Sequence, residues 1–179
     1  MKKLPGCAIL LIGESGSGKT SLAEALIRSR PERYQHIPGT TTRPRREGEE
    51  ALHHFITPEA FARLVDADAF AARFSFNGQE YGTQRQDWER ALARGCVVAT
   101  SSPVLVDQLR KHIEHIAVIK IKPNGTWIRR TGRERIDADQ GAEAYPADLI
   151  LDNTFPDGFQ RALASLQAFA DEWSRGYQE

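Results

Sequence analysis

The chain has 179 residues, of which 40% are hydrophobic and 27% are charged, and its 24 lysines and arginines balance its 24 aspartates and glutamates. This length suits a single domain with its own hydrophobic core, and the composition excludes a disordered chain. The balanced charge argues against a general binder of nucleic acid or of anionic membranes. We therefore expect a small-molecule partner, no nucleic acid and no membrane, while the oligomeric state stays open.

In chain order, short apolar runs alternate with helical patterns. The runs are typical of parallel strands buried on both faces, and they cover residues 7–12, 96–100, 116–121 and 148–153. The helical patterns cover residues 21–30, 57–70, 87–95 and 159–173. In the second of these, Thr57 is placed to cap the helix and Pro58 to occupy its first position. The alternation predicts an α/β fold with a parallel sheet flanked by helices.

The segment from Gly39 to about Tyr81 breaks the alternation with shorter, mixed pieces and indicates an inserted lobe. The apolar run at the N-terminus stops at Ile12, which is too short for a signal peptide. Cys7 and Cys96 show no metal-ligand or redox spacing, so we expect them to be buried and reduced. Together these features favour a cytoplasmic protein.

A phosphate-binding motif follows the first apolar run. Residues 13–20 read GESGSGKT and match G-x-x-x-x-G-K-[ST] between a strand and a helix, which is the context that the motif requires. Backbone N–H groups and the helix N-terminus would hold the β-phosphate of ATP, and Lys19 would reach the β- and γ-phosphates. The Thr20 hydroxyl would ligate Mg²⁺. The predicted ATP site comprises Gly13, Glu14, Ser15, Gly16, Ser17, Gly18, Lys19, Thr20 and Ser21.

A second group of residues has the chemistry of an anion-binding site. Residues 39–50 read GTTTRPRREGEE and place Arg43, Arg45 and Arg46 directly after three threonines. Phosphoryl transfer between two anions needs cations that offset their repulsion, and arginine binds phosphate through two parallel hydrogen bonds. The stretch therefore predicts a clamp for the phosphate of the molecule that is phosphorylated.

This stretch resembles the acceptor loop of the guanylate kinase family, T-T-R-x-P-R-x-G-E. The residues in register are Thr41, Thr42, Arg43, Arg46, Gly48 and Glu49, and Pro44 comes one place early. The later stretch NGQEYGT is similar to the family's G-x-Y-Y-G-[ST]. The resemblance implies a P-loop kinase fold and a substrate-binding set that consists of Thr42, Arg43, Arg46, Tyr81 and Thr83.

The resemblance also implies a short lid. Residues 122–139, KPNGTWIRRTGRERIDAD, are similar to the family's lid, in which Arg129, Arg130 and Arg133 are candidates to close over the transferring phosphoryl group. Register favours Arg133, so the implied catalytic residues are Lys19, Arg46 and Arg133. The implied organisation is one domain, with a core at 1–37 and 84–179, an acceptor-binding lobe at about 38–83 and a lid at about 124–145.

The sequence departs from the family's pattern mainly at the positions that recognise the guanine base. Guanylate kinases read guanine with two acidic residues, because a carboxylate accepts from N1–H and the N2 amino group together. In register these positions are Ala72 and Ser101. The strand that carries Ser101 also lacks an acidic pair for magnesium-bound water, which leaves Thr20 as the magnesium ligand.

Three functions follow. The sequence favours an ATP-dependent phosphotransferase that acts on a phosphomonoester other than GMP, such as ribose 1,5-bisphosphate or another nucleotide. The kinases of ribose 1,5-bisphosphate resemble this family without its guanine-reading carboxylates, and their N-G-x-x-Y-G pattern is matched at residues 77–82. The second function is a guanylate kinase with atypical base recognition, in which Glu80 or the acids of EGEE supply the carboxylate. The third is a non-catalytic binding module, against which Lys19 and Thr20 argue.

Overall fold

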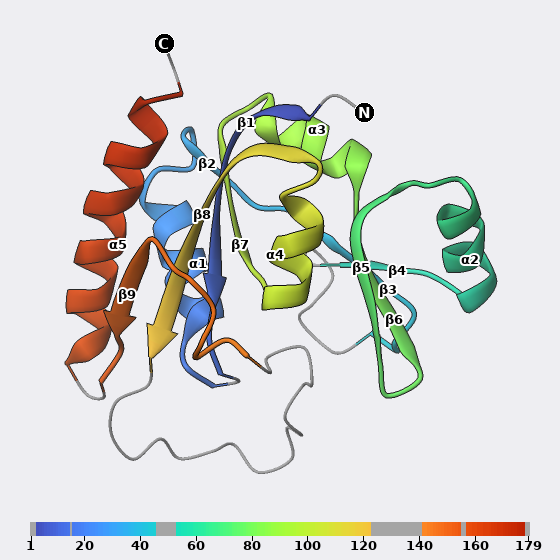
Figure 1. Cartoon of the computed structure of the whole chain (residues 1–179), viewed down its shortest axis with the longest axis horizontal. Helices are drawn as coiled ribbons and strands as arrows, with labels where there is room; N and C mark the ends of the chain where they lie inside the picture. Colours follow the sequence, from blue (N-terminus) through green and yellow to red (C-terminus); the bar gives the residue numbers. More distant parts are fainter. Residues whose placement is uncertain (1–2, 15, 46–52, 123–140, 155–156, 178–179) are drawn as a thin grey trace.

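The structure is a computed structural model that describes residues 3–14, 16–45, 53–122, 141–154 and 157–177. In this part of the chain the strands form two sheets (Figure 1). The core sheet has five parallel strands in the order β2-β7-β1-β8-β9, and the lobe sheet has four strands in the order β4-β3-β6-β5. The α/β fold with a parallel sheet flanked by helices is therefore confirmed.

The core sheet is built on a continuously apolar central strand. Strand β1 (Leu4–Ile12) pairs with β7 (Cys96–Thr100) on one side and with β8 (Ile113–Lys122) on the other, while β2 (Tyr34–Gln35) and β9 (Leu149–Asp152) form the edges. Because successive side chains of a strand point to opposite faces, both faces of β1 are buried. Ile9 and Leu11 pack toward α1 and α5, and Ala8 and Leu10 pack toward α3 and α4.

Four helices cover the two faces of the core sheet. Helices α1 (Lys19–Ser29) and α5 (Gly158–Arg175) lie on one face, and α3 (Arg85–Leu92) and α4 (Pro103–Leu109) lie on the other. Each contributes an apolar stripe, for example Leu22 and Leu26 from α1 and Leu166 from α5. This arrangement places the end of β1, where the P-loop begins, between two covered faces.

The lobe sheet lies beside the core, and helix α2 (Pro58–Asp66) covers its far side (Figure 1). Its strands are β3 (Gly39–Thr41), β4 (His53–Phe55), β5 (Phe70–Phe76) and β6 (Gln79–Gln84). Thr57 caps α2 as predicted, because its hydroxyl accepts a hydrogen bond from the Ala60 N–H at 3.2 Å. Helix α2 ends at Asp66, earlier than its apolar pattern predicted.

The structure differs from the sequence-based expectations mainly in its short elements. The two- and three-residue strands β2, β3 and β4 and the seven-residue helix α4 were not predicted, and β5 and β6 were covered only by the prediction of an inserted lobe of short, mixed segments. Cys7 and Cys96 are buried as expected and lie side by side on the paired strands β1 and β7, with Cα atoms 4.9 Å apart, while the expectation that they are reduced stays a prediction. The predicted lid falls mostly outside the described residues, and the division into core, lobe and lid stays a prediction.

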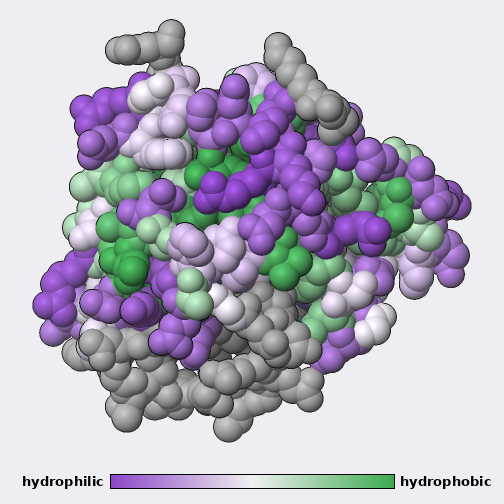
Figure 2. Space-filling view, viewed as in Figure 1, coloured by the Kyte–Doolittle hydropathy of each residue, from purple (hydrophilic) through white to green (hydrophobic). Residues whose placement is uncertain are grey.

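The surface is mixed in character. Hydrophilic residues cover much of the face in Figure 2, with hydrophobic residues in smaller groups between them. Among the described residues the exposed large hydrophobic side chains are Val104, Ile150 and Tyr177, which come from different elements. A search of the described helices for one long and apolar enough to cross a membrane found none.

Candidate active site

The P-loop connects the end of β1 to the start of α1. Its backbone needs glycine at three places, because Gly13, Gly16 and Gly18 have φ values of 143°, 87° and 91°. Gly18 occupies the N-cap position of α1 without a capping side chain, so the N–H groups of the first helical turn can face a ligand. At Gly16 a Cβ atom would meet nothing within 4 Å. The loop therefore has the open, backbone-lined shape of a phosphate cradle.

Two strand ends support this loop from the core sheet. A Cβ atom at Gly13 would overlap the carbonyl oxygen of Ile121 in β8, and a Cβ atom at Gly18 would overlap the side-chain amide of Asn153, directly after β9. The Asn153 Nδ2 group donates to the Ser17 carbonyl at 2.8 Å, and Asn153 is only 4% exposed. Sequence reasoning did not single out Asn153, which lies 136 residues from Ser17.

The P-loop side chains are arranged around this backbone. The Lys19 ammonium group donates to the carbonyl oxygens of Gly13, at 2.5 Å, and Glu14, at 2.8 Å. Ser17 is fully buried, and its hydroxyl has no hydrogen-bond partner among the described residues. Thr20 and Ser21 are exposed in the first turn of α1, where the Thr20 hydroxyl can reach a metal ion. Ser15 lies outside the described residues.

Three of the predicted acceptor residues lie on one face of the lobe sheet, namely Arg43, Tyr81 and Thr83. Tyr81 is paired with Phe74 across β5–β6 and with Thr41 across β3–β6, and the rings of Tyr81 and Phe74 stack with centroids 5.0 Å apart. Thr41 is in turn paired with Phe55 of β4, and the Arg43 guanidinium lies 5.4 Å from the centre of the Phe55 ring. Because paired residues share a face, we call this surface the aromatic face of the lobe sheet.

Two further predicted residues make contacts of different kinds. Thr83 follows Tyr81 by two places and so shares its face, where its hydroxyl accepts a hydrogen bond from Trp88 Nε1 at 2.9 Å. The Thr42 hydroxyl accepts the backbone N–H of Glu80 at 2.9 Å and donates to Gln79 Oε1 at 3.1 Å. Thr42 therefore stabilises the pairing of β3 with β6. The predicted acceptor residues on the aromatic face are Arg43, Tyr81 and Thr83.

Glu80, the candidate for an unusual guanine-reading acid, lies on the other face. It alternates with Tyr81 along β6 and pairs with Ser75 of β5. The Ser75 hydroxyl oxygen lies 2.8 Å from each carboxylate oxygen of Glu80. A ligand held by Tyr81 on the aromatic face would thus have the lobe sheet between itself and the Glu80 carboxylate.

Several predicted residues lie outside the described part of the chain. They include the catalytic candidates Arg46 and Arg133, the alternatives Arg129 and Arg130, and the acids of the EGEE stretch, residues 47–50. Their assignments stay predictions.

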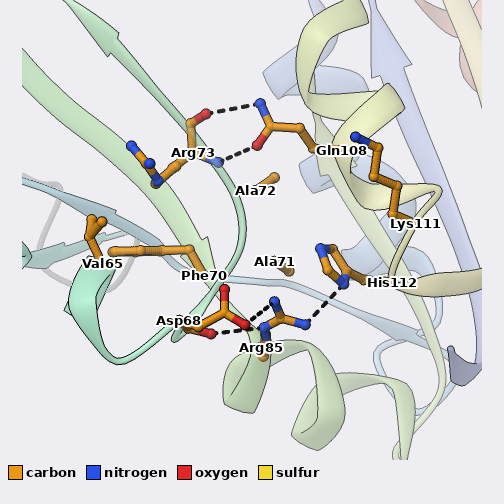
Figure 3. A pocket seen from close by; sticks show the side chains of 10 residues that line it. All are labelled: Val65, Asp68, Phe70, Ala71, Ala72, Arg73, Arg85, Gln108, Lys111 and His112. Carbon is orange, nitrogen blue, oxygen red and sulfur yellow. Dashed lines mark hydrogen bonds and ion pairs between the residues drawn. The ribbon is translucent and has the colours of Figure 1, made fainter. Parts of the chain in front are cut away.

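A pocket of about 230 Å³ lies where the lobe meets the core (Figure 3). Arg85 crosses this junction: it donates to the Asp68 carboxylate at 2.9 Å, and its Nη1 atom lies 3.0 Å from His112 Nδ1. His112 immediately precedes β8, so the pocket lies at the opposite end of the parallel core strands from the P-loop. Burial, and then the positive charge of Arg85, lower the pKa of His112.

Comparison with known proteins gives concordant results. The guanylate kinase family model matches residues 6–145. A guanylate kinase of Shewanella denitrificans is 32% identical over 180 residues, which cover 91% of this chain and 86% of that protein. A guanylate kinase of Anaeromyxobacter dehalogenans is 42% identical over 95 residues, and one of Wolinella succinogenes is 38% identical over 100 residues. These two matches cover 52% and 55% of this chain, and 42% and 46% of the relatives' own lengths.

A solved structure is similar over nearly the whole chain. The crystal structure of guanylate kinase from Anaplasma phagocytophilum superposes with a TM-score of 0.70 at 20% identity, and it covers 97% of this chain and 89% of that one. This likeness concerns the fold.

Proposed function

Because the chain belongs to the guanylate kinase family, we propose that it is a guanylate kinase that transfers a phosphoryl group from ATP to GMP, giving ADP and GDP. The family assignment confirms the predicted resemblance and the P-loop kinase fold. The expectation of an acceptor other than GMP is wrong, because the relatives that match this chain are named guanylate kinase. That expectation rested on Ala72 and Ser101, which replace the two acidic residues. These replacements concern how the guanine base is bound and do not identify another acceptor.

One observation supports the proposal: the described P-loop residues form a glycine-lined phosphate cradle in a chain that the family model matches through residue 145. The Lys19 ammonium group lies against the loop carbonyls and would turn to the β- and γ-phosphates when ATP is bound. The same cradle argues against a non-catalytic module, because simple binding needs no hydroxyl placed for a metal ion.

The site suits Mg²⁺ that arrives with ATP. No group of three or more His, Cys, Asp or Glu side chains among the described residues could hold a metal ion. Magnesium often keeps most of its waters and binds through one protein oxygen and substrate phosphates, and the exposed Thr20 hydroxyl can supply that oxygen. Bound Mg²⁺ would offset the charge of the transferring phosphoryl group.

The lobe supplies the acceptor contacts in this proposal. Arg43, held over Phe55, would bind the GMP phosphate through charge-assisted hydrogen bonds, and the Tyr81 hydroxyl would add another. The Thr83 hydroxyl accepts from Trp88, so its own hydrogen can be donated to the acceptor. Because Ala72 has no carboxylate and is 3% exposed, other groups would have to bind guanine in this proposal.

An ADP-release assay tests the proposal. ATP and Mg²⁺ are kept saturating while GMP, AMP and ribose 1,5-bisphosphate are compared as acceptors. We expect kcat/KM for GMP to exceed the other two by at least about tenfold, since about 1.4 kcal/mol of differential transition-state binding suffices. Equal use of GMP and AMP, or ATP binding without any transfer, would contradict it.

A further inference from the structure

The Asn153 side chain controls one peptide group of the P-loop. Its amide donates a buried hydrogen bond of 2.8 Å to the carbonyl oxygen of Ser17. In a planar trans peptide the C=O of one residue and the N–H of the next point in opposite directions. Holding the Ser17 carbonyl against the end of β9 therefore directs the Gly18 N–H away from the core sheet, toward the open side of the loop.

The restraint acts next to Gly18, whose own carbonyl oxygen accepts the Leu22 N–H at 3.0 Å at the start of α1. Gly18 adopts φ of 91°, a region where glycine has several accessible conformations. The close approach of the Asn153 amide leaves no room for a Cβ atom at Gly18, so both residues belong to one packing arrangement.

We propose that Asn153 is a positioning residue that presents the Gly18 N–H to the β-phosphate of ATP. The inference rests on the proposed ATP site. Asn153 acts through the Ser17–Gly18 peptide and does not touch the nucleotide phosphates. It ties their binding to the end of β9, the strand that follows the lid segment in the chain.

The alternative is that Asn153 only terminates the sheet. The contacts separate the two roles, because the backbone N–H of Asn153 donates to the Lys122 carbonyl at 2.9 Å and so extends the β8–β9 pairing without the side chain. Replacing the side chain keeps this backbone hydrogen bond and removes the contacts with the P-loop, which are the hydrogen bond to Ser17 and the packing against Gly18. The chain also offers a control in Asp152, the exposed neighbour at the end of the same strand.

Binding of ATP with Mg²⁺, and of GMP separately, is measured by calorimetry for the wild type, Asn153→Ala, Asn153→Asp and Asp152→Ala. We expect Asn153→Ala to weaken ATP by about tenfold, near the net value of one buried hydrogen bond. GMP binding should change less than about twofold in every variant, and Asp152→Ala should bind ATP as the wild type does.

The Asn153→Asp variant distinguishes the loss of the hydrogen bond to Ser17 from the loss of side-chain volume, because aspartate has nearly the size of asparagine. An ionised carboxylate at this position cannot donate to Ser17 and places charge beside its carbonyl, whereas a protonated carboxyl group has an O–H donor. Burial raises the pKa of a carboxyl group, so ATP affinity of Asn153→Asp should recover as the pH falls from 8 to 5.5, relative to the wild type at the same pH. Asn153→Ala has no titratable group and should show no recovery, and the comparison of Asn153→Asp with the wild type at each pH does not depend on the alanine variant.

Two results would overturn the inference: wild-type ATP affinity in Asn153→Ala, or equal weakening of ATP and GMP. An Asn153→Asp variant whose ATP affinity follows the wild type at every pH would do the same. The proposed function fails separately, if the wild type binds ATP and responds to Asn153 substitution but does not phosphorylate GMP. A wild type that binds no ATP would refute both.

Discussion

Tyr81 and Glu80 are neighbours in β6, yet they serve opposite faces of the lobe sheet. Tyr81 stacks on Phe74 on the aromatic face, while both carboxylate oxygens of Glu80 lie 2.8 Å from the Ser75 hydroxyl on the other face. The alternation of a β-strand forces this separation. The Glu80 side chain therefore lies on the face away from the acceptor, although Glu80 is adjacent in sequence to Tyr81, the proposed phosphate contact.

Replacing Glu80 should therefore leave base recognition intact. For Glu80→Gln we expect kcat/KM for GMP to change by less than about threefold, because only an exposed contact with Ser75 is altered. Steady-state kinetics with GMP and AMP measure the effect, and Ser75→Ala controls for loss of the cross-strand contact. A loss of a hundredfold or more for GMP alone would show that the carboxylate reaches the base.

Arg43→Ala should weaken the acceptor and leave ATP nearly unchanged, because Arg43 belongs to the lobe and the P-loop to the core. Losing a charge-assisted contact with phosphate should cost about 2–3 kcal/mol, which corresponds to a rise of about 30- to 150-fold in the KM for GMP. The matched control is Arg63→Ala in α2, an exposed arginine of the same lobe. Equal effects of the two substitutions would identify Arg43 as a general surface charge.

Lys19→Ala should remove most phosphoryl transfer without unfolding the protein. The Lys19 side chain contacts loop carbonyls and makes no part of the hydrophobic core, so the melting temperature should stay close to that of the wild type. The turnover should fall at least about a hundredfold, as expected for an electrostatic contact that strengthens in the transition state. Lys111→Ala, at an exposed lysine, is the control. Unchanged kcat at saturating ATP would rule out this role.

The junction between lobe and core should lose stability in mild acid. The pKa of His112 is lowered, chiefly by burial and then by Arg85, so the folded protein takes up the imidazole proton only at a lower pH than the unfolded chain does. As the pH falls below about 6.5, the unfolded state binds more protons and the free energy of unfolding decreases. Above about pH 6.5 the contribution of neutral His112 to the free energy of unfolding is fully present.

His112→Asn should reduce this pH dependence, since the asparagine carbonyl can still accept from Arg85 but does not titrate. Urea unfolding between pH 7.5 and 5 measures the slope of the free energy of unfolding against pH, and His115→Asn is the control at a histidine outside the pocket. An identical slope in His112→Asn and the wild type would exclude His112 as its source.

The sequence predicted the parts of the fold that rest on local pattern. Continuous apolar runs identified β1, β7 and β8, which are buried on both faces, and the edge strand β9, in which Leu151 is buried and Ile150 is exposed, while the spacing of glycines identified the P-loop. Short elements leave no such periodicity, so β2, β3 and β4 were missed, and the mixed segment that holds β5 and β6 was predicted only as part of an inserted lobe. Helix α4 did carry a signal, since Ser102 and Pro103 occupy its N-cap and first position.

The candidate site was predictable only where a motif carries it. Lys19 and Arg43 stand in recognisable patterns, whereas the contact between Asn153 and Ser17 joins residues 136 positions apart and needs the assembled sheet. The acceptor was misjudged for a related reason. Ala72 and Ser101 removed two expected contacts, but the absence of particular side chains does not identify a substitute ligand. The overall similarity to named guanylate kinases bears on the acceptor more directly.

The pairing of β2 with β7 has a consequence for how the chain folds. Tyr34 and Cys96 are direct partners in the core sheet, and the roughly 60 residues between β2 and β7 contain the whole lobe. Closing a loop of that length costs about 2 kcal/mol more conformational entropy than closing one of about six residues. The lobe leaves and rejoins the core at adjoining strands, so its length and content can vary without shifting the register beneath the phosphate cradle. The lobe's share of the acceptor contacts can therefore diverge in one continuous segment while the core sheet stays unchanged.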